Sequence, residues 1–74
     1  MKVIVCGAGQ VGSSIVRHLV AENNDVTVID SSAELIRKIS DSMDVKAMKG
    51  YASHPDVLEA AGAEDADMIV AVTY

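Results

Sequence analysis

Three glycines in the segment Gly7-Ala8-Gly9-Gln10-Val11-Gly12 and one acid, Asp30, are the residues whose types and spacing suggest chemistry. The glycine segment directly follows the apolar run 2–6, and Asp30 closes the next apolar run. In a strand–turn–helix unit, the first glycine permits a tight turn, the second lets the backbone approach a pyrophosphate, and the third allows close helix packing. The pattern therefore predicts a dinucleotide-binding unit. Its helix N-terminus would bind phosphates through free N–H groups, without lysine or arginine.

Asp30 is expected at the end of the second strand, where its carboxylate can accept hydrogen bonds from both ribose hydroxyls of an adenosine and repel a 2′-phosphate. Ser31 and Ser32 follow it, with no arginine beside them, which favours NAD(H) over NADP(H). The alternative role for Asp30 is a strand-end turn or a helix N-cap. ATP or ADP is an alternative ligand, because the glycine loop and Asp30 recognise only the adenosine half of a dinucleotide.

Two further segments are expected at the same edge of the sheet. Gly50, Tyr51 and Ala52 follow the third strand and are predicted to border the adenine, although an ordinary strand-to-helix turn explains them as well. Thr73 ends the fourth strand and is predicted to approach the central phosphates or the second ribose.

The other reactive side chains have simpler interpretations. Cys6 precedes the glycine turn within a strand and is predicted to be a buried hydrophobic residue rather than a nucleophile. His18 and His54 are predicted to lie on the surface, without a catalytic role. The acids between Gly62 and the fourth strand, Glu64, Asp65 and Asp67, are predicted to form a solvated turn rather than a metal site.

The elements that must position these residues follow from the apolar pattern. Strands are predicted at residues 3–6, 25–29, 45–48 and 68–72. Helices are predicted from Val11 to near Asn23-Asn24, over 32–42 and up to Ala61, where Gly62 ends the third helix. The order β-α-β-α-β-α-β predicts an α/β, Rossmann-like fold with a parallel sheet in the order 3-2-1-4, truncated after the fourth strand. Residues 1–74 would then form a partial NAD(H)-binding domain.

Helix starts are predicted from capping residues. Ser31 and Glu34 match a capping box for the second helix, with Ser31 as the cap. Ser53 is predicted to cap the third helix, with Pro55 in its first turn. Lys46 favours an edge position for the third strand.

Composition excludes several classes of protein. The 74 residues carry a formal net charge of −5 and no basic stripe, which argues against nucleic acid as a partner. A single cysteine forms no internal disulfide and fits a reducing, cytoplasmic compartment. The apolar run at the N-terminus is too short for a secretion signal or a membrane span, so no direct membrane insertion is expected.

The chain resembles the N-terminal, TrkA-N lobe of the Trk-type potassium-uptake regulatory proteins, the KTN or RCK nucleotide-binding family. The resemblance rests on residues 3–12, on Val28-Ile29-Asp30, on Gly50 with its turn, and above all on the stretch from Leu58 to Thr73. It implies a regulatory subunit in potassium ion transport. Such a subunit binds NAD(H) or adenine nucleotides and assembles in the cytoplasm on an integral-membrane potassium transporter or channel, without substrate turnover.

The resemblance also assigns residues to the ligand. It places Gly7, Gly9, Gln10, Val11 and Gly12 on the phosphates, Asp30 on the ribose, Tyr51 and Ala52 on the adenine side and Thr73 across the cleft. Tyr51 departs from the acid or asparagine usual in the family.

Because the family's lobe continues beyond the fourth strand, that strand is expected to be an exposed apolar edge, and only the third helix is expected to cover one face of the sheet. Self-association as a homo-oligomer through this edge or this face is predicted.

Two other functions compete with a ligand-sensing role. The chain could be the cofactor-binding half of an NAD-dependent oxidoreductase, but neither a substrate pocket nor an acid or base for hydride transfer is visible in the sequence. It could also be a structural or interaction module that has lost its ligand. Retention of the three glycines and Asp30 makes that less economical.

Overall fold

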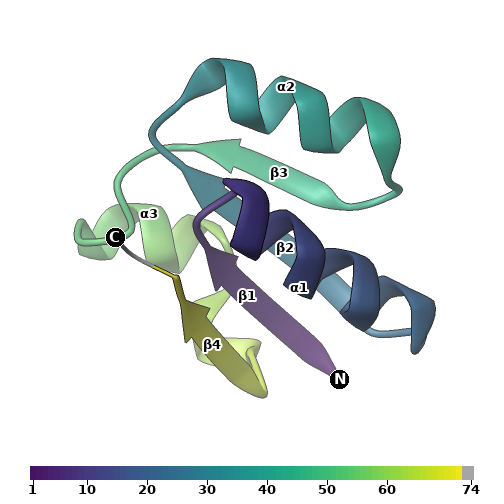
Figure 1. Cartoon of the computed structure of the whole chain (residues 1–74). Coiled ribbons are helices and arrows are strands. Elements are labelled where there is room, and N and C mark those ends of the chain that lie inside the picture. The colour runs from purple at the N-terminus through teal and green to yellow at the C-terminus, as the bar shows by residue number, and fades with distance from the viewer. Residues whose placement is uncertain (73–74) are drawn as a thin grey trace.

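Four parallel strands form a single sheet in the order β3-β2-β1-β4, which is the predicted Rossmann-like order. A computed structural model describes residues 1–72. Its elements are β1 (Lys2–Cys6), α1 (Gln10–Ala21), β2 (Asp25–Asp30), α2 (Ala33–Ser42), β3 (Lys46–Lys49), α3 (Pro55–Ala60), the 3-10 helix η1 (Ala63–Asp65) and β4 (Met68–Ala71). The carboxyl ends of β1, β2 and β3 lie together at one edge of the sheet (Figure 1).

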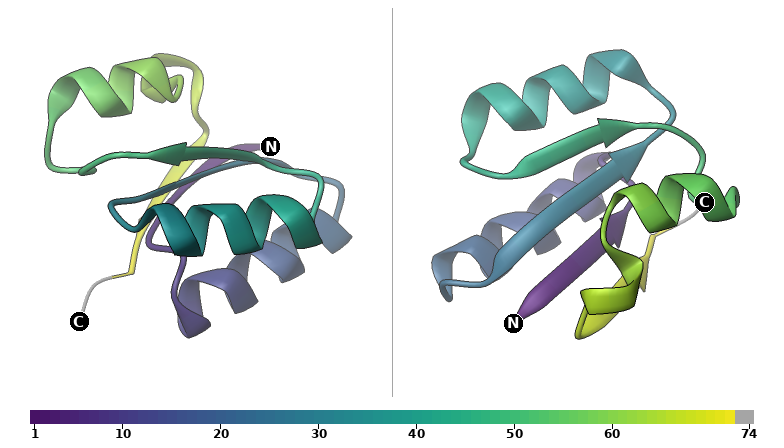
Figure 2. Two further views of the ribbon diagram at one scale, coloured as in Figure 1. Left: turned by 90° about the horizontal axis from the view of Figure 1, so that it is seen from above. Right: turned by 180° about the vertical axis from the view of Figure 1, so that it is seen from behind.

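The two central strands are buried on both faces, which explains their continuous runs of β-branched residues. Val3, Val5, Val26 and Val28 pack under α1 and α2 on one face. Ile4, Cys6 and Ile29 face α3 and η1 on the other. Figure 2 shows the resulting three layers, with α1 and α2 on one side of the sheet and α3, followed by the short η1, on the other; α3 is the α-helix that was predicted to cover that face.

Both outer strands are shorter and more exposed than β1 and β2. β3 carries Lys46 at its exposed start, in agreement with the predicted edge position. β4 pairs with β1 on one side, and the apolar side chains of Met68 and Ile69 are 44% and 48% exposed. The predicted apolar edge is therefore present in the described part of the chain.

The predicted caps of α2 and α3 were wrong. Ser32 caps α2, because its hydroxyl oxygen accepts the N–H of Leu35 at 3.3 Å. Ser31 lies before the helix, in a turn that Asp30 holds by accepting the N–H of Ser32 at 2.8 Å. At α3 the N-cap is His54, without a side-chain cap hydrogen bond, and Pro55 is the first helical residue.

Other element ends shift by a residue or two from their predicted positions. α1 ends at Ala21 rather than near Asn23-Asn24, since Asn23 adopts a left-handed conformation with φ 64°. α3 ends at Ala60, and Gly62 follows with φ 91°, in agreement with its predicted role as the stop.

The described helices include none that is both long and apolar enough to cross a membrane.

Candidate nucleotide-binding site

The turn between β1 and α1 requires glycine at two positions. Gly7 has φ 123°, and a Cβ there would lie 2.5 Å from the carbonyl oxygen of Val72. A Cβ on Gly12 would overlap the carbonyl oxygen of Gly7 and lie 2.7 Å from its carbon. The first turn of α1 thus packs directly on the backbone of the glycine turn. These are the tight-turn and close-packing roles predicted for the two glycines.

Within residues 1–72, no side chain caps the backbone N–H groups at the start of α1. Gly9 is the N-cap, in an extended conformation and without a side-chain cap hydrogen bond. The N–H groups that follow it belong to Gln10, Val11 and Gly12, while the N–H of Ser13 already donates to the Gly9 carbonyl at 2.8 Å. Free N–H groups at a helix start form a binding site for anions, and the helix dipole favours a negative charge there.

Asp30 joins the glycine turn to the start of α2. One carboxylate oxygen accepts the N–H of Ala8 at 2.8 Å, and the other accepts the N–H of Ser32 at 2.8 Å. Asp30 is half-buried. An ionised carboxylate offers about four acceptor positions, so about two remain for further donors. The carboxylate therefore lies beside the glycine turn with capacity for two hydroxyl donors.

A cleft of about 400 Å³ lies over the carboxyl edge of the sheet. Its volume falls within the range of about 300 to 1,000 Å³ that is typical of small-molecule sites. The cleft is lined by Cys6, Gly7, Gly9, Val11, Gly12, Ile29, Asp30, Ser31, Leu35, Gly50, Tyr51, Ala52 and Val72. Asp30 is the only charged residue in this described lining, so a bound phosphate would meet backbone N–H groups rather than a basic side chain.

Most of the residues predicted for the site line this one cleft. Gln10 does not belong to the lining; its exposed side chain lies at the start of α1. Thr73 lies outside the described residues. The sequence analysis did not assign Cys6, Ile29, Leu35 or Val72 to the site. Cys6 is the last residue of β1 and Ile29 the last but one of β2, so the order of the strands in the sheet was the signal that could have placed them there.

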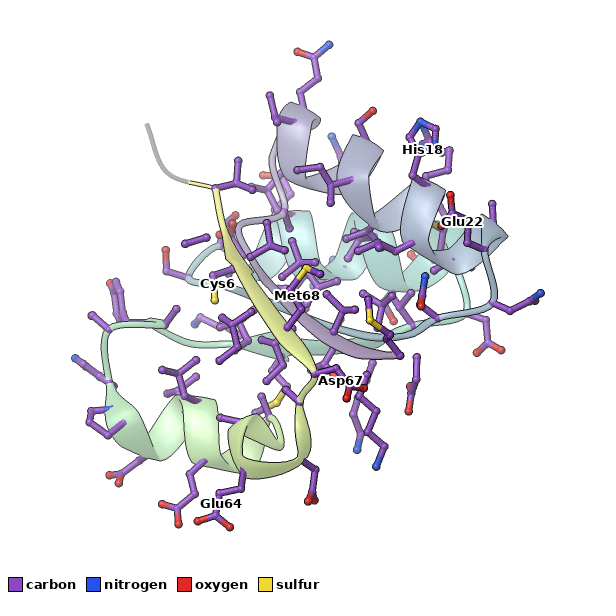
Figure 3. The ribbon with its side chains drawn as sticks, turned by 90° about the horizontal axis from the view of Figure 1, so that it is seen from below. Cys6, His18, Glu22, Glu64, Asp67 and Met68 are labelled. Carbon is purple, nitrogen blue, oxygen red and sulfur yellow. The ribbon has the colours of Figure 1, made fainter. Side chains whose placement is uncertain are left out.

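Cys6 is 8% exposed and lies on the α3 side of the sheet (Figure 3). Burial raises the pKa of its thiol, which disfavours the reactive thiolate. This agrees with the predicted role as a small buried hydrophobic residue.

The two histidines and the acids after Gly62 do not belong to the cleft lining. His18 projects from the outer side of α1 (Figure 3), and His54 is exposed, in agreement with the surface positions predicted for both. Glu64, Asp65 and Asp67 are exposed, as predicted for a solvated turn. Asp67 also accepts the N–H of Lys2 at 2.7 Å, which ties the start of β4 to the start of β1.

Two solved structures resemble nearly the whole of this chain. The carboxy-terminal domain of Kef from Shewanella denitrificans, solved in an AMP-bound form, matches 93% of this chain with a TM-score of 0.79 and 35% identity; the match covers 40% of the Kef chain. The TrkA-N domain of the inner membrane protein YbaL from Escherichia coli matches 95% of this chain and 51% of its own, with a TM-score of 0.86 and 24% identity. The second comparison shows the fold alone.

Sequence comparison gives the family. The chain is 55% identical over 73 residues to the Trk system potassium uptake protein TrkA of Vibrio alginolyticus, and 52% identical over 73 residues to that of Azorhizobium caulinodans. Each match covers 99% of this chain but only 16% of the relative. Residues 3–74 match the TrkA-N domain. The chain belongs to the TrkA-N domain family.

Proposed function

We propose that the chain is a regulatory module that binds NAD(H), ADP or ATP in the cleft over its glycine turn and so controls a membrane-embedded potassium transporter or channel. The phosphates would bind the N–H groups at the start of α1, and Asp30 would bind the ribose. Tyr51 and Ala52 would border the adenine, and Thr73 would lie on the far side of the ligand. The module would act in the cytoplasm, as a homo-oligomer on its transporter subunit.

The observation that carries this proposal is the pair of hydrogen bonds made by Asp30. Both N–H donors come from backbone that borders the cleft, so they hold the carboxylate beside the helix start where phosphates would bind. A nucleotide needs hydrogen-bond donors for its phosphate and an acceptor for its ribose hydroxyls, and the two sets must lie close together because the two groups are covalently joined. NAD(H) is favoured over NADP(H), because a 2′-phosphate would meet the negative charge of Asp30.

The comparisons support the biological setting. The relatives that match at 52% to 55% identity are named as potassium uptake proteins, and the Kef domain was solved with AMP. AMP is the portion shared by NAD(H), ADP and ATP, which is the portion that the glycine turn and Asp30 would recognise. This relationship supports the proposal that the chain controls potassium transport and assembles on a membrane subunit.

The test is calorimetric titration of the chain with AMP, ATP, NADH and NADPH, for wild type and for Asp30→Asn. Loss of a hydrogen bond to a charged group costs about 1.5–3 kcal/mol, so Asp30→Asn should weaken AMP and NADH binding about 10- to 150-fold. The same substitution should narrow the preference for NADH over NADPH, because it removes the charge that repels the 2′-phosphate. Competition between ATP and NADH then identifies the preferred ligand.

Asp41→Asn is the matched control, since Asp41 is exposed on α2 and its replacement makes the same change in net charge. It should leave all affinities unchanged. A folded wild-type sample that binds neither NADH nor an adenine nucleotide would refute the proposal. Equal weakening of NADH and NADPH by Asp30→Asn would show that the carboxylate acts only by holding the turn.

A further inference from the structure

The cleft has an aromatic side chain at the end away from the glycine turn. Tyr51 lines the cleft and is 62% exposed, the largest exposed fraction among the large hydrophobic residues of the described chain. One side of its ring faces the ring of His54, with centroids 5.5 Å apart and planes at 47°. The N–H of His54 also donates to the Tyr51 carbonyl at 3.0 Å. The ring is thus supported by its neighbour while much of its surface stays open.

The order of the strands gives a direction to any nucleotide bound here. The glycine turn follows β1, Asp30 ends β2, and Gly50 and Tyr51 follow β3, and these strands are successive neighbours in the sheet. The N–H of Gly50 donates to the Asp30 carbonyl at 2.9 Å, so the β3 turn is attached directly to the residue proposed for the ribose. With phosphates at α1 and ribose at Asp30, the base extends toward Tyr51.

Apart from Tyr51 and Asp30, the lining offers mostly aliphatic side chains and few polar groups that could recognise the edge of a base. Leu35 and Ala52 are aliphatic, and Ser31 carries a hydroxyl. No amide, guanidinium, ammonium or imidazole side chain belongs to the lining within residues 1–72. The carbonyl of Tyr51 is already used by the His54 N–H. Stacking is tolerant of base identity, because every base has a π face.

We infer that Tyr51 is the base-stacking residue of this site and that the site accepts purine nucleotides by the face of the base, with little discrimination among adenine, hypoxanthine and guanine. The inference rests on the proposed function and specifies the ligand class as purine ribonucleotides. Selectivity then lies in the ribose and phosphates, at Asp30 and the start of α1. Tyr51 determines affinity for the base without selecting one purine over another.

The experiment is a double-mutant cycle that removes the ring from the protein and the base from the ligand. Calorimetry measures the affinities of wild type, Tyr51→Phe and Tyr51→Ala for AMP, IMP, GMP and ribose 5-phosphate. Wild type should bind AMP, IMP and GMP within about 5-fold of one another, and ribose 5-phosphate about 5- to 150-fold more weakly. Tyr51→Ala should weaken the binding of AMP by that same factor and leave the binding of ribose 5-phosphate unchanged. Tyr51→Phe should bind AMP with the affinity of wild type.

Tyrosine fluorescence provides a second readout, because the chain has two tyrosines and no tryptophan. AMP should quench the emission of wild type and leave that of Tyr51→Phe unchanged, whereas ribose 5-phosphate should quench neither. The inference fails alone if wild type binds AMP and Tyr51→Ala binds it equally well, or if IMP and GMP are rejected more than 10-fold. If wild type binds neither AMP nor ribose 5-phosphate, the proposed function and this inference fail together.

Discussion

Replacement of Gly12 by alanine has two opposing effects on the free energy of unfolding, and the structure indicates which one is larger. Gly12 is in the first turn of α1, where alanine is the better helix former by about 1 kcal/mol. The added Cβ, however, would overlap the carbonyl oxygen of Gly7 and lie 2.7 Å from its carbon. That carbonyl belongs to backbone that the Gly7 N–H fixes to the Ile29 carbonyl at 2.8 Å. Backbone of this kind cannot move aside as the end of a flexible side chain can.

The size of the effect follows from the two terms. Overpacking costs about 1–3 kcal/mol, and a clash with fixed backbone belongs at the upper end of that range. After the gain in helix propensity, a net loss of about 2 kcal/mol remains. For a domain of this size, such a loss lowers the Tm by about 8–16 °C. The measurement is urea denaturation followed by circular dichroism, with thermal melting as a second readout.

Ser14→Ala is the matched control, because Ser14 is exposed in the same helix and its replacement changes helix propensity without a clash. It should leave the free energy of unfolding unchanged or raise it by up to about 0.5 kcal/mol. Gly12→Ala should therefore lower the free energy of unfolding, whereas Ser14→Ala should not lower it. A midpoint for Gly12→Ala equal to or above that of wild type would refute the close packing of α1 on the glycine turn.

Two further predictions concern the same domain. Ser32→Ala should lower the free energy of unfolding by about 1 kcal/mol, because the Ser32 hydroxyl caps the N–H of Leu35, whereas Ser31→Ala should change it by less than about 0.5 kcal/mol. The reverse ranking in urea denaturation would restore Ser31 as the cap. Burial raises the pKa of the Cys6 thiol, so the unfolded chain loses this proton at lower pH than the folded chain, and stability should fall as pH rises above the ordinary thiol value. Cys6→Ala should lack this part of the alkaline decline, and identical pH profiles for the two proteins would contradict it.

The sheet and the glycine turn could be predicted from the sequence because the residue patterns that specify them fit no other local structure equally well. Val3 to Cys6 is an unbroken apolar run, and Val26 to Ile29 is interrupted only by Thr27, which is also buried. Strands covered on both faces bury every residue of such runs. A side chain at Gly7 or Gly12 would clash with backbone, so glycine at these two positions was enough to predict the tight turn and the close packing of α1. The strand order then follows from the right-handed crossover rule.

The helix starts could not be predicted with the same certainty, because several side chains compete for the same N–H groups. Ser31, Ser32 and Asp30 are all good acceptors near the start of α2. Asp30 takes the N–H of Ser32, and this bond shifts the cap by one residue. The outcome depends on where the end of β2 directs Asp30, which is a property of the sheet and not of the local sequence. Leu35 was missed from the cleft lining for a related reason, since its position depends on how α2 packs.

The double attachment of Asp30 bears on how such a module could signal. Because Asp30 accepts the N–H groups of both Ala8 and Ser32, these bonds hold the sites proposed for phosphate and ribose in a fixed arrangement relative to each other. Every adenine nucleotide would meet this part of the cleft in the same way, and a ligand shifts an equilibrium only by its differential affinity for two states. Different nucleotides can therefore produce different outputs only through contacts beyond the shared adenosine monophosphate. In the described chain, Val72 follows the edge strand β4 and is the cleft-lining residue on the side of β1 opposite to Asp30 and Tyr51.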